Sequence, residues 1–517
     1  MREELWLESR TGTPVIANDT LVAGMAYRLS MQGTFTVWSS LATPAANSGE
    51  PEAKPMWPSV TRSDMSVGLD PEFRFAWPSG SSLANSSEPS PRRGSSIQFS
   101  LDGGETWKHL ESSAPYNPRN HTYLYDVEGA GHPLQVRFVD SPYSDNNGRI
   151  KIIVQSAGRF DPERLATGGN HSLVAMKDGS IMAFGEGRKG QLGDGAATNR
   201  YAPVQVTQPG NVVVVGAGQD HSLAITADGR LWAWGDNGAG QLGVAASAES
   251  TRPSPGLVPG LEHVIQVAGG QKHTLALTRD GKVYAWGDNS TEQLGGAPGA
   301  AHEPSQVPGL PVIRLIATGN NHNLVLASDG TVWTWGENRT GQLGDGTRQM
   351  RAASRQVEGL PADIRDITAG DNFSLALAAD GTVWGWGQGD TSSLGEDAAM
   401  KEFLPRKVSK LDNVVSISAG DKHTVALTAD GKVFAWGMNP YGELGNGSTE
   451  NSATPVQVSG LSDVAGLSAD IGQHTLAVTG DAKVWGWGRN HVGQLGNKDL
   501  GQQATTPAQI PGLTAVS

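Results

Sequence analysis

The sequence predicts an all-β protein in which an antiparallel β-sandwich is followed by a seven-bladed β-propeller. Two observations predict the propeller: one segment recurs seven times from residue 166 onward with a period of about 50 residues, and every copy holds short apolar runs separated by turn residues. The sandwich is predicted by several short alternating runs, divided by turn signals, in the residues before the repeats. We expect the two domains to cover residues 1–155 and 159–517.

The third copy shows the repeat most clearly. Its apolar runs occupy residues 264–267, 273–278 and 283–286, and a fourth run follows a Leu-Gly step. Asp280-Gly281 separates the second run from the third, and this pair is a strong hairpin signal because a type I′ turn needs positive φ at both positions. Four strands in about 50 residues form one blade, and seven blades can close into a ring. The glycine after the aromatic residue of the third run marks the copies: Gly185, Gly235, Gly287, Gly336, Gly387, Gly437 and Gly488.

The third run also predicts how neighbouring blades pack. In the third copy Tyr284 and Trp286 share one face of the strand, and Val283 and Ala285 share the other, because side chains alternate across a strand. The other copies repeat this division between large aromatic and small aliphatic residues, with Thr or Gly at some small positions. We therefore expect the bulky face of each blade to pack on the small face of its neighbour.

The repeat resembles that of the regulator-of-chromosome-condensation family. The motif Gly-x-x-His-(Ser/Thr), then Asp-Gly-x-(Val/Leu)-aromatic, Trp-Gly and Gly-Gln-Leu-Gly is nearly complete in six copies and covers about 350 residues. The resemblance implies a seven-bladed propeller, whereas function can differ among proteins of one fold. In a light-sensing member of this family tryptophans stand beside the repeat histidine. This chain has Asn170, Asp220, Lys272, Asn321, Asn372, Lys422 and Gln473 there, so we do not expect light sensing.

The composition excludes several classes of function. The formal net charge is −13, with acidic residues in excess in both predicted domains, so binding of nucleic acid through its phosphates is not expected. There is no cysteine, hence no disulfide and no thiolate site. No secretion signal and no long apolar segment occurs, so we expect no membrane insertion, and a protein that is cytoplasmic, part of a virion or secreted without a signal. The motifs H-E-x-x-H, G-x-S-x-G and G-x-x-x-x-G-K-[ST] are absent, and we expect no enzymatic activity.

Short runs predict the strands of the first domain. They fall at residues 21–38, 96–100, 123–125, 134–138 and 150–154, while residues 40–97 are rich in Pro, Ser and Asn and predict long loops. Residues 100–107 match the Asp-box pattern of many secreted β proteins, which predicts a hairpin with a structural role.

Oxygen ligands are concentrated in residues 140–148 of this domain. Asp140, Asp145, Asn146 and a glycine lie within nine residues between two predicted strands, as a calcium loop requires. The alternative is an Asx-rich turn whose side chains cap its own backbone. The same segment, with residues 21–38, resembles the small calcium-dependent galactophilic lectins of bacteria. That resemblance implies Ca²⁺ held by Asp140, Asp145 and Asn146 and a glycan bound through the ion, although the family's His-Pro-Asp-Gln sugar-binding segment has no counterpart here.

Six histidines recur at one position of the repeat, and the fifth copy has Phe373 in their place. We expect these histidines, which are His171, His221, His273, His322, His423 and His474, to be buried and hydrogen-bonded to the backbone and not to form a metal centre. The tail begins another repeat, and we expect residues 513–516 to pair beside the first blade and close the ring.

Together these features predict a non-enzymatic recognition protein. The propeller would bind a protein partner through its variable loops and the first domain would bind a glycan with calcium, as in a bacterial or phage surface component. The alternative is a propeller-type inhibitor or regulator of a partner protein, including a nucleotide-exchange type. A hydrolase that uses acidic loop residues is the third hypothesis.

Overall fold

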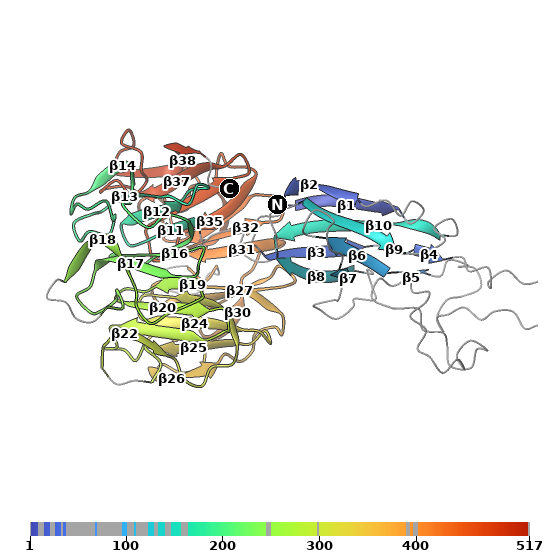
Figure 1. Cartoon of the computed structure of the whole chain (residues 1–517). Helices are drawn as coiled ribbons and strands as arrows, with labels where there is room; N and C mark the ends of the chain where they lie inside the picture. The colour runs from blue at the N-terminus through green and yellow to red at the C-terminus, as the bar shows by residue number, and fades with distance from the viewer. Residues whose placement is uncertain are drawn as a thin grey trace, which may run out of the picture. The chain divides into compact units, whose positions relative to one another are not determined.

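The computed structural model describes residues 164–514 except 245–249, 297–298, 389–392 and 396–401, and before them the backbone of ten strands. The chain forms two compact units, Met1–Gly158 and Arg159–Ser517 (Figure 1). Within the described residues there is no α-helix, and so none that could cross a membrane.

The ten strands of the first unit pair antiparallel in two sheets. One sheet has the order β5-β4-β10-β3-β8, with β1 also on β10, and the other has the order β2-β9-β6-β7. Pairing of β6 with β7 joins the two ends of the Asp-box segment and confirms the predicted hairpin. The sequence runs did not reveal β1 and β2. The strands are β1 (Arg2–Glu8), β2 (Val15–Thr20), β3 (Ala26–Gln32), β4 (Phe35–Val37), β5 (Gly68–Leu69), β6 (Ser96–Ser100), β7 (Lys108–His109), β8 (Thr122–Glu128), β9 (Pro133–Val139) and β10 (Asn146–Ser156).

The second unit contains seven four-stranded antiparallel sheets, and the strands of each sheet follow one another in the sequence. These sheets are the seven predicted blades, and we call their strands inner, second, third and outer. From the first blade to the seventh they are β11 (Leu165–Thr167), β12 (His171–Ala175), β13 (Ile181–Gly185), β14 (Arg200–Gln205); β15 (Val212–Ala217), β16 (His221–Thr226), β17 (Leu231–Asp236), β18 (Thr251–Leu257); β19 (Val264–Gly269), β20 (His273–Thr278), β21 (Val283–Gly287), β22 (Ala301–Gln306); β23 (Ile313–Thr318), β24 (His322–Ala327), β25 (Val332–Gly336), β26 (Arg351–Gln356); β27 (Ile364–Ala369), β28 (Phe373–Ala378), β29 (Val383–Gly387), β30 (Glu402–Lys407); β31 (Val414–Ala419), β32 (His423–Thr428), β33 (Val433–Gly437), β34 (Ser452–Gln457); and β35 (Val464–Ser468), β36 (His474–Thr479), β37 (Lys483–Arg489), β38 (Gln503–Thr514).

Neighbouring blades pack as the third run predicts. Trp234 of the second blade is fully buried in one cluster with Ile181 and Ala183 of the first, and Trp232 packs against the same cluster. Aromatic side chains of this size bury about 150–250 Å² each, so these contacts dominate the interior of the ring. The equivalent buried residues of the other blades are Phe184, Trp286, Trp335, Trp386, Trp436 and Trp487.

The last blade packs on the first and closes the ring. Leu165 and Phe184 of the first blade share a buried cluster with Val484 and Leu513 of the seventh. The expectation that residues 513–516 pair beside the first blade is wrong: β38 is the outer strand of the seventh blade, where Thr514 lies opposite Lys483 of β37. Each blade is thus built from consecutive residues. Leu513 contacts the first blade through its side chain and not through strand pairing.

Candidate functional site

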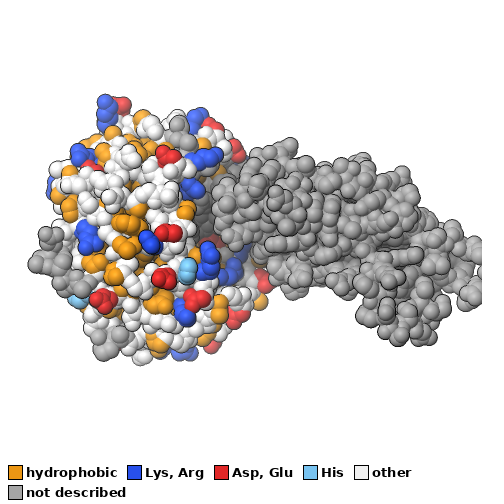
Figure 2. Space-filling view, in the orientation of Figure 1, with side chains coloured by type: hydrophobic (Ala, Val, Ile, Leu, Met, Phe, Trp, Pro, Cys, Tyr) orange, Lys and Arg blue, Asp and Glu red, His pale blue; other side chains and the backbone are white. Residues whose placement is uncertain are grey.

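The antiparallel order of the strands divides the connections of each blade between two ends of the ring. The turns that join the inner to the second strand and the long loops that join the third to the outer strand lie at one end, which we call the loop face. The Asp-Gly hairpins and the connections between blades lie at the other end, which we call the hairpin face. The side of the propeller seen in Figure 2 carries acidic and basic side chains that are interspersed, without a large region of one sign.

Six histidines at the start of the second strands connect the blades below the loop face. All six are buried, and the Nε2 atom of each lies within hydrogen-bonding distance of a side-chain oxygen in the next blade. The prediction that these rings bond to the backbone was wrong for Nε2, because the partner of Nε2 is a side-chain hydroxyl or, for His273, a side-chain amide oxygen. The pairs are His171–Ser222 (2.8 Å), His221–Thr274 (3.0 Å), His273–Asn323 (2.8 Å), His322–Ser374 (3.0 Å), His423–Thr475 (2.9 Å) and His474–Ser172 (2.7 Å).

The partners of these oxygens determine which ring nitrogen carries the proton. Asn323 donates its Nδ2 hydrogen to the Gln293 carbonyl (2.8 Å), so its Oδ1 atom can only accept, and His273 must donate from Nε2. The Ser222 hydroxyl likewise donates to the Gln191 carbonyl (2.7 Å) and accepts from His171. The Nδ1 atom is then the unprotonated nitrogen.

Burial keeps these imidazoles neutral. Desolvation lowers the pKa of His221, His322 and His474 to about 3 and that of His171, His273 and His423 to about 4. A second proton would reside on Nδ1, which has no hydrogen-bond partner in five of the six described rings. Neutral, inward-facing rings of this kind are structural and are poorly suited to proton transfer at neutral pH.

A glycine makes room for each ring. A β-carbon on Gly218 would lie 2.0 Å from Cε1 of His221, and one on Gly370 would lie 2.1 Å from Cε1 of Phe373. The glycine before the histidine in each copy is therefore required by the side chain that follows it, and the fifth blade keeps the space although its side chain is Phe.

The Leu-Gly step of each of the first six blades is preceded by a residue whose carbonyl accepts the indole of the next blade. That residue is Gln in four of these blades, Ser393 in the fifth and Glu443 in the sixth. Trp286 donates its Nε1 hydrogen to the Gln241 carbonyl (2.9 Å), while the Gln241 side chain accepts from Ala239 N (2.9 Å) and donates to Asp236 (2.7 Å). The same indole-to-carbonyl bond forms at Trp234, Trp335, Trp386, Trp436 and Trp487. These bonds fix the base of the loop in six blades to the neighbouring blade, and in the seventh the Gln494 carbonyl accepts from Ser172 instead (2.9 Å).

The sixth blade replaces this glutamine with Glu443. Its side chain still accepts from Tyr441 N (2.8 Å), but it is 97 % shielded from solvent, and burial raises its pKa to about 7. The charge of Arg489 partly opposes this rise in the pKa. The Arg489 guanidinium lies over the Tyr441 ring, 4.6 Å from its centroid, and donates to Gln473 (2.6 Å). Sequence reasoning missed this group, although the change from Gln to Glu in a repeated motif was visible.

Carboxylates gather at the centre of the loop face, in the turns before the histidines. Asp371 accepts from Asn320 (2.6 Å), and its pKa is raised by burial and by Asp421. Asp421 accepts from Gln473 (2.8 Å). These turns occupy equivalent positions around the axis. They place Asp220, Asp371 and Asp421 beside the channel opening together with Lys272 and Lys422, and Asp220 is paired with Lys189 (3.3 Å).

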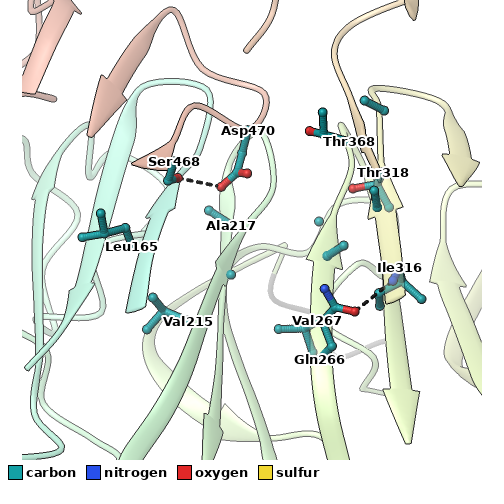
Figure 3. Close-up of a pocket in the computed structure, with 15 residues that line it drawn as sticks. Leu165, Val215, Ala217, Gln266, Val267, Ile316, Thr318, Thr368, Ser468 and Asp470 are labelled. Atoms are coloured by element: carbon teal, nitrogen blue, oxygen red, sulfur yellow. Dashed lines mark hydrogen bonds between the residues drawn. The ribbon is translucent and has the colours of Figure 1, made fainter. Parts of the chain in front are cut away.

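The axis of the ring is a narrow polar channel. The inner strands surround a cavity of about 60 Å³. Figure 3 shows residues that line it, where Gln266 accepts from Ile316 N (2.8 Å) and Ser468 donates to Asp470 (2.9 Å). Drug-sized ligands need about 300–1,000 Å³, so this cavity is too small for a ligand of that size. Asp470 also accepts from Thr167 N (3.3 Å) and so links the seventh blade to the first.

The predicted calcium ligands are only partly placed. Asp140 and Asp145 lie outside the described residues, and Asn146 is the first residue of β10, opposite Val37 of β4. Within the described residues no group of three or more His, Cys, Asp or Glu side chains could hold a metal ion. The calcium site therefore stays a prediction.

Comparison with known proteins decides the family. The RCC1-like domain matches residues 144–361 and 313–517, which together span more than half of the chain. The chain belongs to the RCC1-like domain family. This assignment confirms the resemblance inferred from the repeat.

Individual proteins that are similar to this RCC1-like protein agree with the family assignment. It is 33% identical to the ultraviolet-B receptor UVR8 of Arabidopsis thaliana over 355 residues, which are 67% of this chain and 70% of that protein. It is 30% identical to protein pim1 of Schizosaccharomyces pombe over 260 residues, 48% of this chain but only 42% of pim1.

Among solved structures, Prp20p of Saccharomyces cerevisiae superposes with a TM-score of 0.59 at 23% identity, covering 68% of this chain and 88% of that one. Human WBSCR16 superposes with a TM-score of 0.55 at 23% identity, covering 74% and 97%. These structures show the same fold.

Proposed function

We propose that this RCC1-like protein is a regulator that binds a protein partner on the loop face of its propeller. The observation that carries the proposal is the set of carboxylates in the turns around the channel opening, which are Asp220, Asp371 and Asp421. Lys272 and Lys422 lie in the same set of turns, so the charges there are mixed with acidic groups in excess. The structure of Prp20p was described together with its binding to Gsp1p and histones, which are protein partners. A partner for this chain would present basic side chains to the three carboxylates.

The loops around this centre are suited to selective binding. They are held at their bases by the histidine and tryptophan bonds, whereas their sequences after the Leu-Gly step differ from blade to blade. Rigid attachment reduces the entropy lost on binding, and the variable tips supply specificity. The channel cavity is too small for a substrate, which favours binding over catalysis at this face.

A set of isosteric substitutions tests the proposal. Asp220→Asn, Asp371→Asn and Asp421→Asn together remove three charges from the loop face, and Asp228→Asn, Asp280→Asn and Asp430→Asn remove three from the hairpin face. Full-length protein purified from its own cells should carry a stoichiometric protein partner that the first variant loses, with affinity lower by about tenfold or more, and that the second retains. Retention by the first variant, or the absence of any partner, would contradict the proposal.

We also propose that residues 1–155 form an antiparallel sandwich that binds Ca²⁺ through Asp140, Asp145 and Asn146 and, through the ion, a glycan. Support comes from the two antiparallel sheets and from the strand bounds, since β9 ends at Val139 and β10 begins at Asn146. Titration calorimetry with CaCl₂ should show one site that Asp140→Ala removes. Equal calcium uptake by Asp140→Ala would refute it.

A further inference from the structure

The outer strands of the blades differ at one position that controls strand pairing. In six of the seven blades a proline stands three residues before the buried Val or Ile that ends the outer segment: Pro203, Pro255, Pro304, Pro405, Pro455 and Pro507. In the fourth blade Ser354 occupies that position, three residues before Val357. Each outer strand is the last in its sheet, so its free edge is open to pairing with another chain.

Hydrogen bonding shows which backbone groups face that edge. Val357 N donates to Val332 O (2.8 Å), and Arg355 lies opposite Thr334 in the ladder of β25 and β26. Backbone groups alternate in direction where a ladder is regular, so the N–H group of Gln356 points away from the blade. Ser354 lies at a register shift between Arg355 and Arg351 and has no opposite residue in the ladder of β25. At the equivalent position the other six blades have proline, which has no N–H and blocks edge pairing.

The charge of this edge indicates what could pair with it. β26 contains Arg351 and Arg355, and Met350 before it is exposed. Arg351 is paired with Asp345, whereas Arg355 is exposed and forms no ion pair within the described residues. A second copy of β26, paired antiparallel, would bring arginines of two chains together, which is unfavourable. An acidic strand would instead meet complementary charge.

We propose that β26, at the rim of the fourth blade (Figure 1), binds an extended acidic segment of a partner protein by adding it as a fifth strand to the sheet. Main-chain hydrogen bonds to Ser354 and Gln356 provide the affinity, and Arg355 selects acidic side chains on alternate positions of the added strand. This surface is on the rim and is independent of the loop face, so the two proposals succeed or fail separately.

Substitution of Ser354 tests this directly. Ser354→Pro installs the residue that six other blades already accommodate, and Ser354→Ala keeps the N–H as the matched control. The probe is a fluorescent peptide of alternating Thr and Glu, compared with one of alternating Thr and Lys, measured by anisotropy on the full-length chain. We expect saturable binding of the Thr/Glu peptide to the wild type and to Ser354→Ala, weaker by about tenfold or more for Ser354→Pro and for Arg355→Glu.

Three results would overturn the proposal. The first is the absence of saturable binding of the Thr/Glu peptide to the wild type. The second is equal binding to Ser354→Pro when circular dichroism and melting temperature show that this variant is folded like the wild type. The third is a concentration-dependent dimer, measured by sedimentation, that Ser354→Pro abolishes, because the occupant of β26 would then be a second copy of this chain.

Discussion

The Nε2 atom of His474 lies 2.7 Å from the Oγ atom of Ser172, and this bond joins the seventh blade to the first. Ser172 also donates to the Gln494 carbonyl (2.9 Å), so one buried hydroxyl serves two groups of the last blade. Ser172→Ala should leave both without a partner and lower the free energy of unfolding by about 1–3 kcal/mol. Urea unfolding measures this, with Ser180→Ala, an exposed hairpin hydroxyl, expected within about 0.5 kcal/mol of the wild type. Equal effects of the two variants would contradict closure through this bond.

The buried histidines predict that the propeller loses stability in mild acid. Their folded pKa values of about 3 or 4 lie below the ordinary value of 6.5, so the unfolded chain binds protons first. Stability is therefore complete above about pH 6.5 and falls as the pH decreases towards 4, by up to about 1.4 kcal/mol per pH unit for each histidine. Thermal unfolding at a series of pH values measures the slope. A melting temperature that does not change between about pH 7 and pH 5 would be inconsistent with neutral buried rings.

The first residue of the second strand is His in six blades and Phe373 in the fifth, and exchanging His and Phe should have unequal effects in the two directions. His273→Phe removes the donor to Asn323 and should cost about 1–3 kcal/mol, because a buried amide oxygen loses its partner. Phe373→His places an imidazole where Gly370 already leaves space and where Thr424 of the next blade supplies a hydroxyl, so we expect a change within about 1 kcal/mol. Denaturant unfolding of both variants provides the comparison. A larger loss for Phe373→His than for His273→Phe would contradict the inter-blade role of the hydrogen bond.

Glu443 opposes stability at neutral and alkaline pH. Its folded pKa of about 7 lies above the ordinary 4.5, so the contribution of the protonated form is present below about pH 4.5 and is lost as the pH rises through 7. Glu443→Gln installs the residue that five other blades have at this position and should stabilise the protein above pH 7 by about 2–3 kcal/mol, with no gain near pH 4.5. Melting curves of both proteins at the two pH values test this. A gain that is equal at both would mean that ionisation is not the cause.

The sequence was sufficient for the propeller because its repeat makes each local signal appear seven times. Glycine spacing, Asp-Gly turns and the two faces of the third run predicted the blades and their packing. The partner of each histidine could not be predicted, because Ser222 or Asn323 is one blade away and its side-chain direction depends on how the blades stack. Residues 513–516 were misplaced for a related reason: β38 continues to pair with β37, although Leu513 contacts the first blade.

The loop face could be predicted only in part. Variable loops on a rigid ring indicated where binding resides, but they did not indicate which end of the ring is involved. The raised pKa values of Asp371 and Glu443 depend on burial and on neighbours from other blades, which one chain segment does not reveal. The calcium ligands Asp140 and Asp145 lie outside the described residues, so their prediction rests on sequence alone.

Lysine labelling of the complex with the co-purified partner tests the central claim most directly. Lys189, Lys272 and Lys422 lie on the loop face, and Lys177, Lys282 and Lys432 lie on the hairpin face, so three lysines at each end serve as reporters. Mass spectrometry after acetylation of the free and bound protein should show Lys189, Lys272 and Lys422 protected by the partner and the other three unchanged. Protection confined to Lys177, Lys282 and Lys432 would contradict the account.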